Sequence, residues 1–217
     1  ETEYAWYYPM LKVMLLTGMR ISEVGGLCWS DVDYENDIIH IRRALYSQYE
    51  YGERHLRFTT TKTINSVRDI PMMADCKKML KLQKKNQDRI KKELGKRYRS
   101  EYEEGLSDLV FTSSMGSAAT RYNVAPIINK IVQSINLRED YESVQENREP
   151  VYMKPVSPHA LRRSFCTRCF EAGMNIKVVQ KIMGHNNYAT TANIYTEVMP
   201  DKMNEEIELF NSKLLAL

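Results

Sequence analysis

Two segments of the sequence place residues of chemical interest at suggestive spacings. His159 and Arg162 are three residues apart, so both side chains leave the same face of a predicted helix. A proline before His159 favours the first helical turn, which places that imidazole near a helix N-terminus, where anions bind. His185 follows Gly184, a residue type that ends helices, and Tyr195 comes ten residues after His185. These residues could bind an anion beside a tyrosine nucleophile, but a helix end with buried aromatic rings is the ordinary alternative.

Two further cations stand in short connections. Arg20 lies in "TGMRIS", between two largely apolar helices that we predict at about Tyr4–Leu16 and from Ser22 to about Trp29. Capping of a helix or a pair with Glu23 is the ordinary explanation for Arg20. Lys62 lies between two stretches rich in β-branched residues, so we expect it at the tip of a β-hairpin, where a lysine is ordinarily just solvated.

The remaining sequence supplies the elements that must position these side chains. The pattern predicts a mainly α, α+β fold with one small three-stranded antiparallel sheet. The expected strands are Asp37–Leu45, Leu56–Thr63 and Val67–Pro71, the last two forming the hairpin. The expected later helices are Ala74–Leu94, Asn123–Ile135, Pro158–Ala172, a helix capped by Asn175 and Gly184, and an amphipathic helix after Pro200, with a long loop over Leu137–Pro155.

Composition limits the class of protein. The 217 residues suit one domain, and 43% hydrophobic with 27% charged residues can form a core and argue against disorder. Four cysteines are too few and too irregular for a disulfide framework, and Cys166 and Cys169 fit the apolar stripe of a helix better than a redox or zinc motif. The chain has no apolar run of about 18 residues, so we expect no contact with a membrane. We also expect no cofactor and no metal.

The net charge of only +3 does not by itself indicate a nucleic-acid partner, but the charges are unevenly placed. The helix Ala74–Leu94 is densely basic, and it includes Lys77, Lys81, Lys84 and Lys85. Contact with a DNA backbone is one explanation, and a solvated helix face is the other.

Four motifs, in order along the chain, resemble the signatures of the tyrosine recombinase (phage integrase) family. They are "TGMRISEVGGLCWSDVD", "TKTINSVRDIP", "SPHALRRSF" and "MGHNNYATTANIYTEV". Together they span Thr17 to Val198, and the style of the first two is most similar to integrases of conjugative transposons and Gram-positive phages. One departure is Arg163, which stands where many family members have a second histidine.

The resemblance implies a role for each residue. Tyr195 would attack a DNA phosphodiester and form a 3′-phosphotyrosyl link, with no metal and no ATP. Arg20 and Arg162 would clamp the phosphate, since a guanidinium fork suits two oxygens and stays charged. The resemblance further implies that Lys62 is the general acid, that His159 is a base or a hydrogen-bond donor, and that His185 donates a hydrogen bond to a phosphate oxygen.

The resemblance also implies organisation and partners. Residues 1–199 would form the catalytic domain, and residues 200–217 a helix exchanged with a neighbouring protomer in a tetramer on DNA. The expected partners are double-stranded DNA with attachment sites and an accessory excision factor, in the cytoplasm of a bacterium at the nucleoid. DNA contacts at Lys77, Lys81, Lys84, Lys85 and Arg163 are a separate expectation from their positive charge, because the basic helix is longer than in minimal relatives and the resemblance gives it no role.

Other functions compete with this one. A non-catalytic DNA-binding module would use the same basic surface, but it has no need of Tyr195 beside two phosphate-binding arginines. A metal-dependent nuclease would need clustered carboxylates, which the sequence lacks at ligand spacing. A type IB topoisomerase shares the chemistry but not this form of the motifs, and Tyr188 competes with Tyr195 as the nucleophile.

Overall fold

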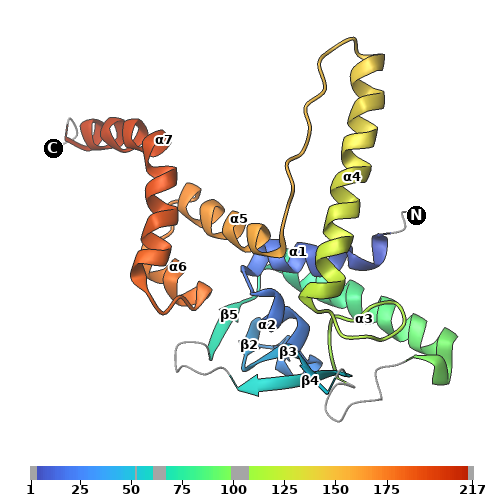
Figure 1. Ribbon diagram of the computed structural model, residues 1–217. Helices are drawn as coiled ribbons and strands as arrows, with labels where there is room; N and C mark the ends of the chain where they lie inside the picture. Colours follow the sequence, from blue (N-terminus) through green and yellow to red (C-terminus); the bar gives the residue numbers. More distant parts are fainter. Residues whose placement is uncertain (1–3, 52, 61–66, 99–107, 215–217) are drawn as a thin grey trace.

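The computed structural model describes residues 4–51, 53–60, 67–98 and 108–214. Helices dominate, and a few short strands lie beside them (Figure 1). The helices are α1 (Tyr8–Thr17), α2 (Ile21–Gly26), α3 (Ala74–Leu94), α4 (Arg121–Gln145), α5 (Pro158–Glu171), α6 (Ile176–Met183) and α7 (Tyr188–Leu214). The strands are β1 (Val32–Asp33), β2 (Ile38–Ile41), β3 (Arg43–Glu50), β4 (Glu53–Thr60) and β5 (Arg68–Pro71). The mainly α fold with small antiparallel sheets that the sequence predicts is confirmed.

The pairing of the strands differs from the prediction. A three-stranded sheet is present, but its order is β1-β2-β5, and β3 and β4 form a separate two-stranded hairpin. The predicted hairpin of Leu56–Thr63 with Val67–Pro71 is wrong, because β4 pairs along its length with β3 and β5 pairs with β2. Ile39 lies opposite Ile70 in the first sheet, and both side chains are buried, which fixes the register of β5 on β2.

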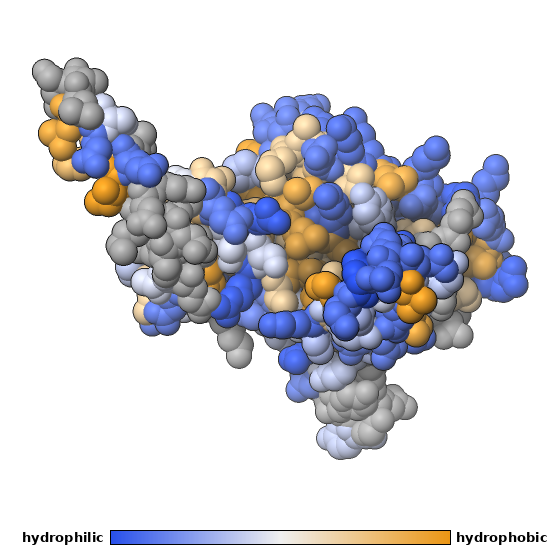
Figure 2. All heavy atoms as spheres, turned by 90° about the horizontal axis from the view of Figure 1, so that it is seen from above, coloured by the Kyte–Doolittle hydropathy of each residue, from blue (hydrophilic) through white to orange (hydrophobic). Residues whose placement is uncertain are grey.

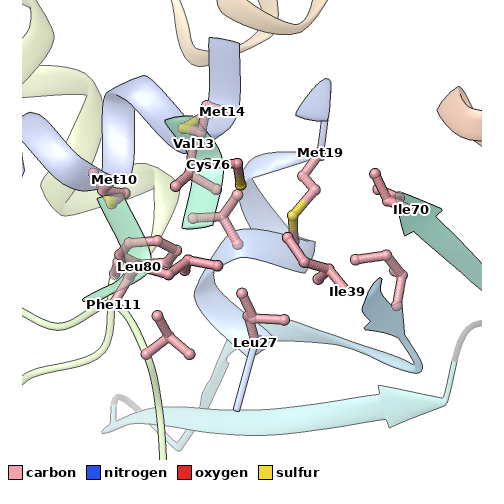
Figure 3. Packing of buried hydrophobic residues seen from close by; sticks show 14 of the residues in the cluster. Met10, Val13, Met14, Met19, Leu27, Ile39, Ile70, Cys76, Leu80 and Phe111 are labelled. Atoms are coloured by element: carbon pink, nitrogen blue, oxygen red, sulfur yellow. The ribbon is translucent and has the colours of Figure 1, made fainter. Parts of the chain in front are cut away.

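Two clusters of buried side chains hold the helices together. The larger one joins α1, α2, α3 and the three-stranded sheet, with Val13, Met14, Ile39 and Leu80 fully buried (Figure 3). The smaller one joins α5, α6 and α7 around Phe170. It includes the buried thiols of Cys166 and Cys169, which confirms that these cysteines belong to an apolar stripe. The α5–α7 unit therefore has its own core.

Helix α4 and the chain that follows it form a projecting arm (Figure 1). The loop predicted over Leu137–Pro155 is wrong in its first part, since α4 continues to Gln145. The returning chain stabilises these extra turns: Asn136 and Met153 exchange two hydrogen bonds, and Tyr152 donates to Asp140. Long-range partners of this kind are not visible in local periodicity.

Two other helix boundaries also differ. The backbone of Arg20, not of Ser22, caps α2, and α1 begins at Tyr8 after a 3-10 turn at Ala5–Tyr7. The separate helix predicted after Pro200 is instead the second half of α7, which runs without interruption from Tyr188 to Leu214. None of the helices in the described ranges is long and apolar enough to cross a membrane.

Candidate active site

Two glycine turns bring distant parts of the chain together. Gly18 ends α1 and Gly184 ends α6, both with positive φ (64° and 63°), a conformation that glycine adopts without strain. A Cβ on Gly18 would lie only 2.4 Å from the ring of Phe165 in α5, so the turn also needs the missing side chain. The end of α1 therefore packs closely on α5, next to the end of α6.

Arg20 reaches across this junction. It is the N-cap of α2, and its Nη1 donates to Glu23 Oε1 at 2.7 Å while its Nη2 donates to the carbonyl of Gly184 at 2.8 Å. Its side chain keeps 37% of its surface exposed, so it can still accept a ligand. The ordinary explanation of Arg20 as a partner of Glu23 is thus confirmed, and the pair lies within the cluster of candidate residues.

Arg162 is a buried cation of the cluster. Its Nη1 donates to the Gly18 carbonyl at 2.6 Å and its Nη2 to the Met183 carbonyl at 2.5 Å, so it ties α5 to both glycine turns. Burial, and then the positive charge of Arg20, lower the pKa of this guanidinium. A bound anion would offset both effects, which makes the cluster a favourable place for a phosphate.

Two further residues complete the cluster. Arg68, the first residue of β5, donates from Nη1 and Nη2 to the two carboxylate oxygens of Glu23, each at 2.9 Å. Burial would raise the pKa of Glu23, but hydrogen bonds and charge from Arg68, and then the charge of Arg20, lower it to about 2. Three guanidinium groups around one carboxylate leave the cluster positively charged.

His185 is held in a fixed orientation. Its Nδ1 lies 2.8 Å from the hydroxyl of Thr191, which is fully buried in the first turn of α7. Burial, and then the charges of Arg162, Arg20 and Arg68, lower the pKa of His185 to about 4. The imidazole is therefore neutral near pH 7 in the DNA-free protein, and it can donate one ring N–H to an anion.

A groove of about 500 Å³ opens above these residues. Its lining comes from α5, the end of α6, the segment that joins α6 to α7 and the first turns of α7, and it includes His159, Arg162, Arg163 and His185. The hydroxyl of Ser157 accepts from the Ala160 amide at 3.1 Å, and this cap sets the start of α5, where His159 is exposed. His159, Arg162 and His185 therefore lie around the same groove.

Tyr195 does not line this groove among the described residues, although the adjacent Asn193 and Ile194 do. Its ring packs edge-on against Phe170 of α5, with the centroids 5.0 Å apart. The predicted nucleophile thus lies on the helix that borders the groove, turned toward the smaller core. Lys62 lies outside the described residues.

Tyr188, the competitor, lies at the first residue of α7. Its ring is 43% exposed, and the Nζ atom of Lys177 lies 4.6 Å from the ring centroid. It also lies outside the groove lining. Neither tyrosine is therefore among the residues that line the groove.

Three of the four α3 lysines predicted to contact DNA have partners within the chain. Lys77 pairs with Asp37, Lys84 pairs with Asp88, and Lys81 lies above the Tyr34 ring. Figure 1 shows α3 running away from α6 and α7. Of the residues predicted to bind DNA, Arg163 alone lines the groove.

Two residues of the cluster, Glu23 and Arg68, lie outside the sequence-based site prediction. Glu23 had a local signal, because a glutamate at the third helical position after a capping residue forms a capping box. Arg68 had no local sequence signal, because its partner Glu23 is 45 residues away in sequence. No group of three or more His, Cys, Asp or Glu side chains within the described ranges could hold a metal ion.

Comparison with known proteins identifies the family. The phage integrase family matches residues 1–202 of the chain. A "Tyrosine recombinase XerC-like" protein of Caldanaerobacter subterraneus subsp. tengcongensis is 30% identical over 210 residues, which cover 93% of this chain and 49% of that protein. The "Transposase from transposon Tn916" of Enterococcus faecalis is 31% identical over 216 residues, or 98% of this chain and 47% of the transposase.

A solved structure of the Tn1549 transposon integrase in complex with circular intermediate DNA is 28% identical, with a TM-score of 0.75, and covers 97% of this chain and 61% of that one. The fold is that of a tyrosine recombinase catalytic domain. The chain belongs to the phage integrase family. It spans about half the length of the curated relatives that it matches.

Proposed function

We propose that the chain is the catalytic domain of a site-specific DNA recombinase that integrates and excises a mobile element. The Tyr195 phenol oxygen attacks the scissile phosphorus and loses its proton, and the bond from phosphorus to the 5′-oxygen breaks. The leaving oxygen takes up a proton and becomes a 5′-hydroxyl, while the DNA end stays on the protein as a 3′-phosphotyrosyl ester. Attack by another 5′-hydroxyl reverses the step, so strand exchange consumes no ATP.

The cationic cluster supplies the stabilisation that this reaction needs. Arg20 and Arg162 bind the non-bridging oxygens, where negative charge gathers in the transition state. His185 donates to one of these oxygens from its neutral ring. His159 acts either as the base that accepts the proton of the nucleophile or as a hydrogen-bond donor. Lys62 is proposed as the acid for the 5′-oxygen. No step requires a metal ion.

One observation carries this proposal: Arg20, Arg162 and His185, which are far apart in sequence, meet through the Gly18 and Gly184 turns beside one groove. Relatives named as a tyrosine recombinase and a transposase, and a DNA complex of a similar integrase, agree with it. A phosphodiester fits a groove that is lined by Arg162 and Arg163 and by the imidazoles of His159 and His185.

The direct test is a nicked suicide DNA substrate that carries candidate attachment sites and traps the covalent adduct. We expect an adduct with the unchanged chain and with Tyr188→Phe, and none with Tyr195→Phe. Tyr195→Phe keeps the ring against Phe170, so its melting temperature should be unchanged. An adduct that survives Tyr195→Phe, or is lost with Tyr188→Phe alone, would overturn the assignment.

The alternative is a DNA-binding module without catalysis. It predicts retained DNA binding and no adduct on any substrate that the protein binds specifically. The same experiment therefore separates the two functions, provided that binding is measured alongside cleavage.

The second half of α7 is proposed to dock on a neighbouring protomer in a tetramer on DNA. Ile207, Phe210 and Leu214 are 57%, 60% and 51% exposed, at three- and four-residue spacing on one helix face. Figure 2 shows hydrophobic side chains on this projecting end of the molecule. Deletion of residues 201–217 should abolish assembly on DNA but not binding to a single site, and unchanged assembly would rule out the exchange. The same proposal includes binding of an accessory excision factor and a location at the bacterial nucleoid.

A further inference from the structure

Arg68 is a buried cation without a role in the reaction described above. Its side chain is only 4% exposed, and it lies within the cationic cluster, paired with Glu23. It donates to both carboxylate oxygens of Glu23, and its Nε donates to the carbonyl of Ile182, in the last turn of α6, at 2.6 Å. One planar guanidinium therefore connects α2 with α6.

The same guanidinium supports the Gly184 turn. A Cβ built on Gly184 would lie 3.0 Å from Nη1 and 3.1 Å from Cζ of Arg68, so the two residues are in close contact. The Gly184 carbonyl accepts from Arg20 Nη2. Arg68 thus contacts both groups that accept hydrogen bonds from the Arg20 side chain. These groups are the Glu23 carboxylate and the Gly184 turn.

The electrostatics favour the same role. Glu23 is buried, and its carboxylate stays ionised because Arg68 and Arg20 offset the cost of burial. Arg20 is also partly exposed, and its side chain must keep its orientation before a phosphate is bound. A lysine at position 68 would keep the charge but could not contact two carboxylate oxygens and a carbonyl from one rigid plane.

We propose that Arg68 is a positioning residue for strand cleavage: through Glu23 and the Gly184 turn it aims Arg20 at the scissile phosphate. This inference rests on the proposed function, since it assumes that Arg20 binds that phosphate. Arg68 contributes no atom to the reacting groups.

A double-mutant cycle tests the proposal. Arg68→Lys, Arg20→Lys and the double variant are made in the full chain, and single-turnover cleavage of the suicide substrate is measured at saturating DNA. We expect Arg68→Lys to slow cleavage by about 10- to 100-fold and to change DNA affinity by less than about threefold. In the Arg20→Lys background, Arg68→Lys should change the rate by less than about twofold, because the contact that it supports is already lost.

A second measurement does not depend on how much of each variant is folded. Each variant cleaves two substrates, one with the normal scissile phosphate and one with a methylphosphonate, which lacks one charged non-bridging oxygen. Removing that oxygen relaxes the need for a cation, so Arg20→Lys and Arg68→Lys should both shift the ratio of the two rates toward the methylphosphonate. The ratio comes from the same protein sample, so the active fraction cancels.

Arg43→Lys is the matched control. Arg43 pairs with Asp31 at 3.0 Å, in a part-buried contact outside the cluster, and the variant should keep both the rate and the ratio. A wild-type ratio in Arg68→Lys together with a shifted ratio in Arg20→Lys, or additive effects in the cycle, would overturn the positioning role. Absence of any adduct with the unchanged chain would instead overturn the proposed function.

Discussion

The ring of Tyr195 packs edge-on against Phe170, with an interplanar angle of 77° and the ring centroids 5.0 Å apart. Phe170 is almost completely buried near the end of α5, so this contact anchors α7 to the smaller core. The proposed nucleophile therefore starts from a docked position, outside the groove where the cations converge. We infer that the first half of α7 shifts before the phenol reaches a phosphate bound there.

Weakening this contact should speed cleavage. An aromatic pair contributes about 0.5–1.5 kcal/mol beyond its buried area, so its loss in Phe170→Leu should raise the single-turnover rate about 2- to 10-fold. The same change should lower the free energy of unfolding by about 1 kcal/mol. Phe111→Leu, in the larger core, is the control for destabilisation alone, and it should not raise the rate. A Phe170→Leu rate at or below that of the unchanged chain would argue against release of Tyr195 as the limiting step.

The lowered pKa of His185 predicts how stability depends on pH. In the unfolded chain this imidazole protonates near pH 6.5, whereas in the folded protein it stays neutral until about pH 4. Its contribution to stability is therefore present above pH 6.5 and is lost as the pH falls toward 4. We expect the free energy of unfolding of the unchanged chain to fall between pH 7 and pH 5. In His185→Gln this fall should be smaller by about 1 kcal/mol, a value reduced to allow for the partial exposure of His185. Equal losses in chemical denaturation at the two pH values would contradict a buried neutral His185.

Local signals in the sequence predicted the parts of the site that depend on neighbours along the chain. Asn175 and Gly184 bound α6 as expected, and the proline before His159 begins α5. Each of these residues acts on backbone groups within one helical turn, so its type is enough to place it. His159 and Arg162 share a face for the same reason.

Contacts between distant segments were not predictable in this way. The strand Glu53–Thr60 could pair on either side by composition. It pairs with the preceding strand β3, where Leu45 lies opposite Phe58 in a small hydrophobic cluster. Arg68 was predicted only as part of a strand, because nothing near it in sequence reveals its bonds to Glu23. The docked position of Tyr195 is likewise set by Phe170, from another helix.

Thr191 should act on cleavage through His185. When its hydroxyl donates to Nδ1, the proton of the neutral ring lies on Nε2, which can then donate to a phosphate oxygen. Thr191→Val keeps the branched shape but removes this bond, so we expect cleavage to slow about 5- to 10-fold with little change in DNA affinity. Thr191→Ser keeps the hydroxyl and should restore most of the rate. Equal rates in the Val and Ser variants would show that packing, and not the hydrogen bond, is what Thr191 supplies.

The basic residues differ in what they should contribute to DNA binding. Arg163 lines the groove beside Arg162, so a phosphate contact there would release a counterion. Lys84 lies on α3, where it pairs with Asp88 and lies 5.4 Å from the Trp29 ring centroid. In a Tyr195→Phe background, which binds DNA without cleaving it, we expect Arg163→Ala to reduce the slope of log affinity against log salt by about 0.9. Lys84→Ala is the control of equal charge change and should leave the slope unaltered, because its cation is engaged within the chain and lies on a helix that runs away from the groove. If Lys84→Ala reduced the slope of log affinity against log salt more than Arg163→Ala did, the DNA-binding surface would lie on α3 and not at the groove.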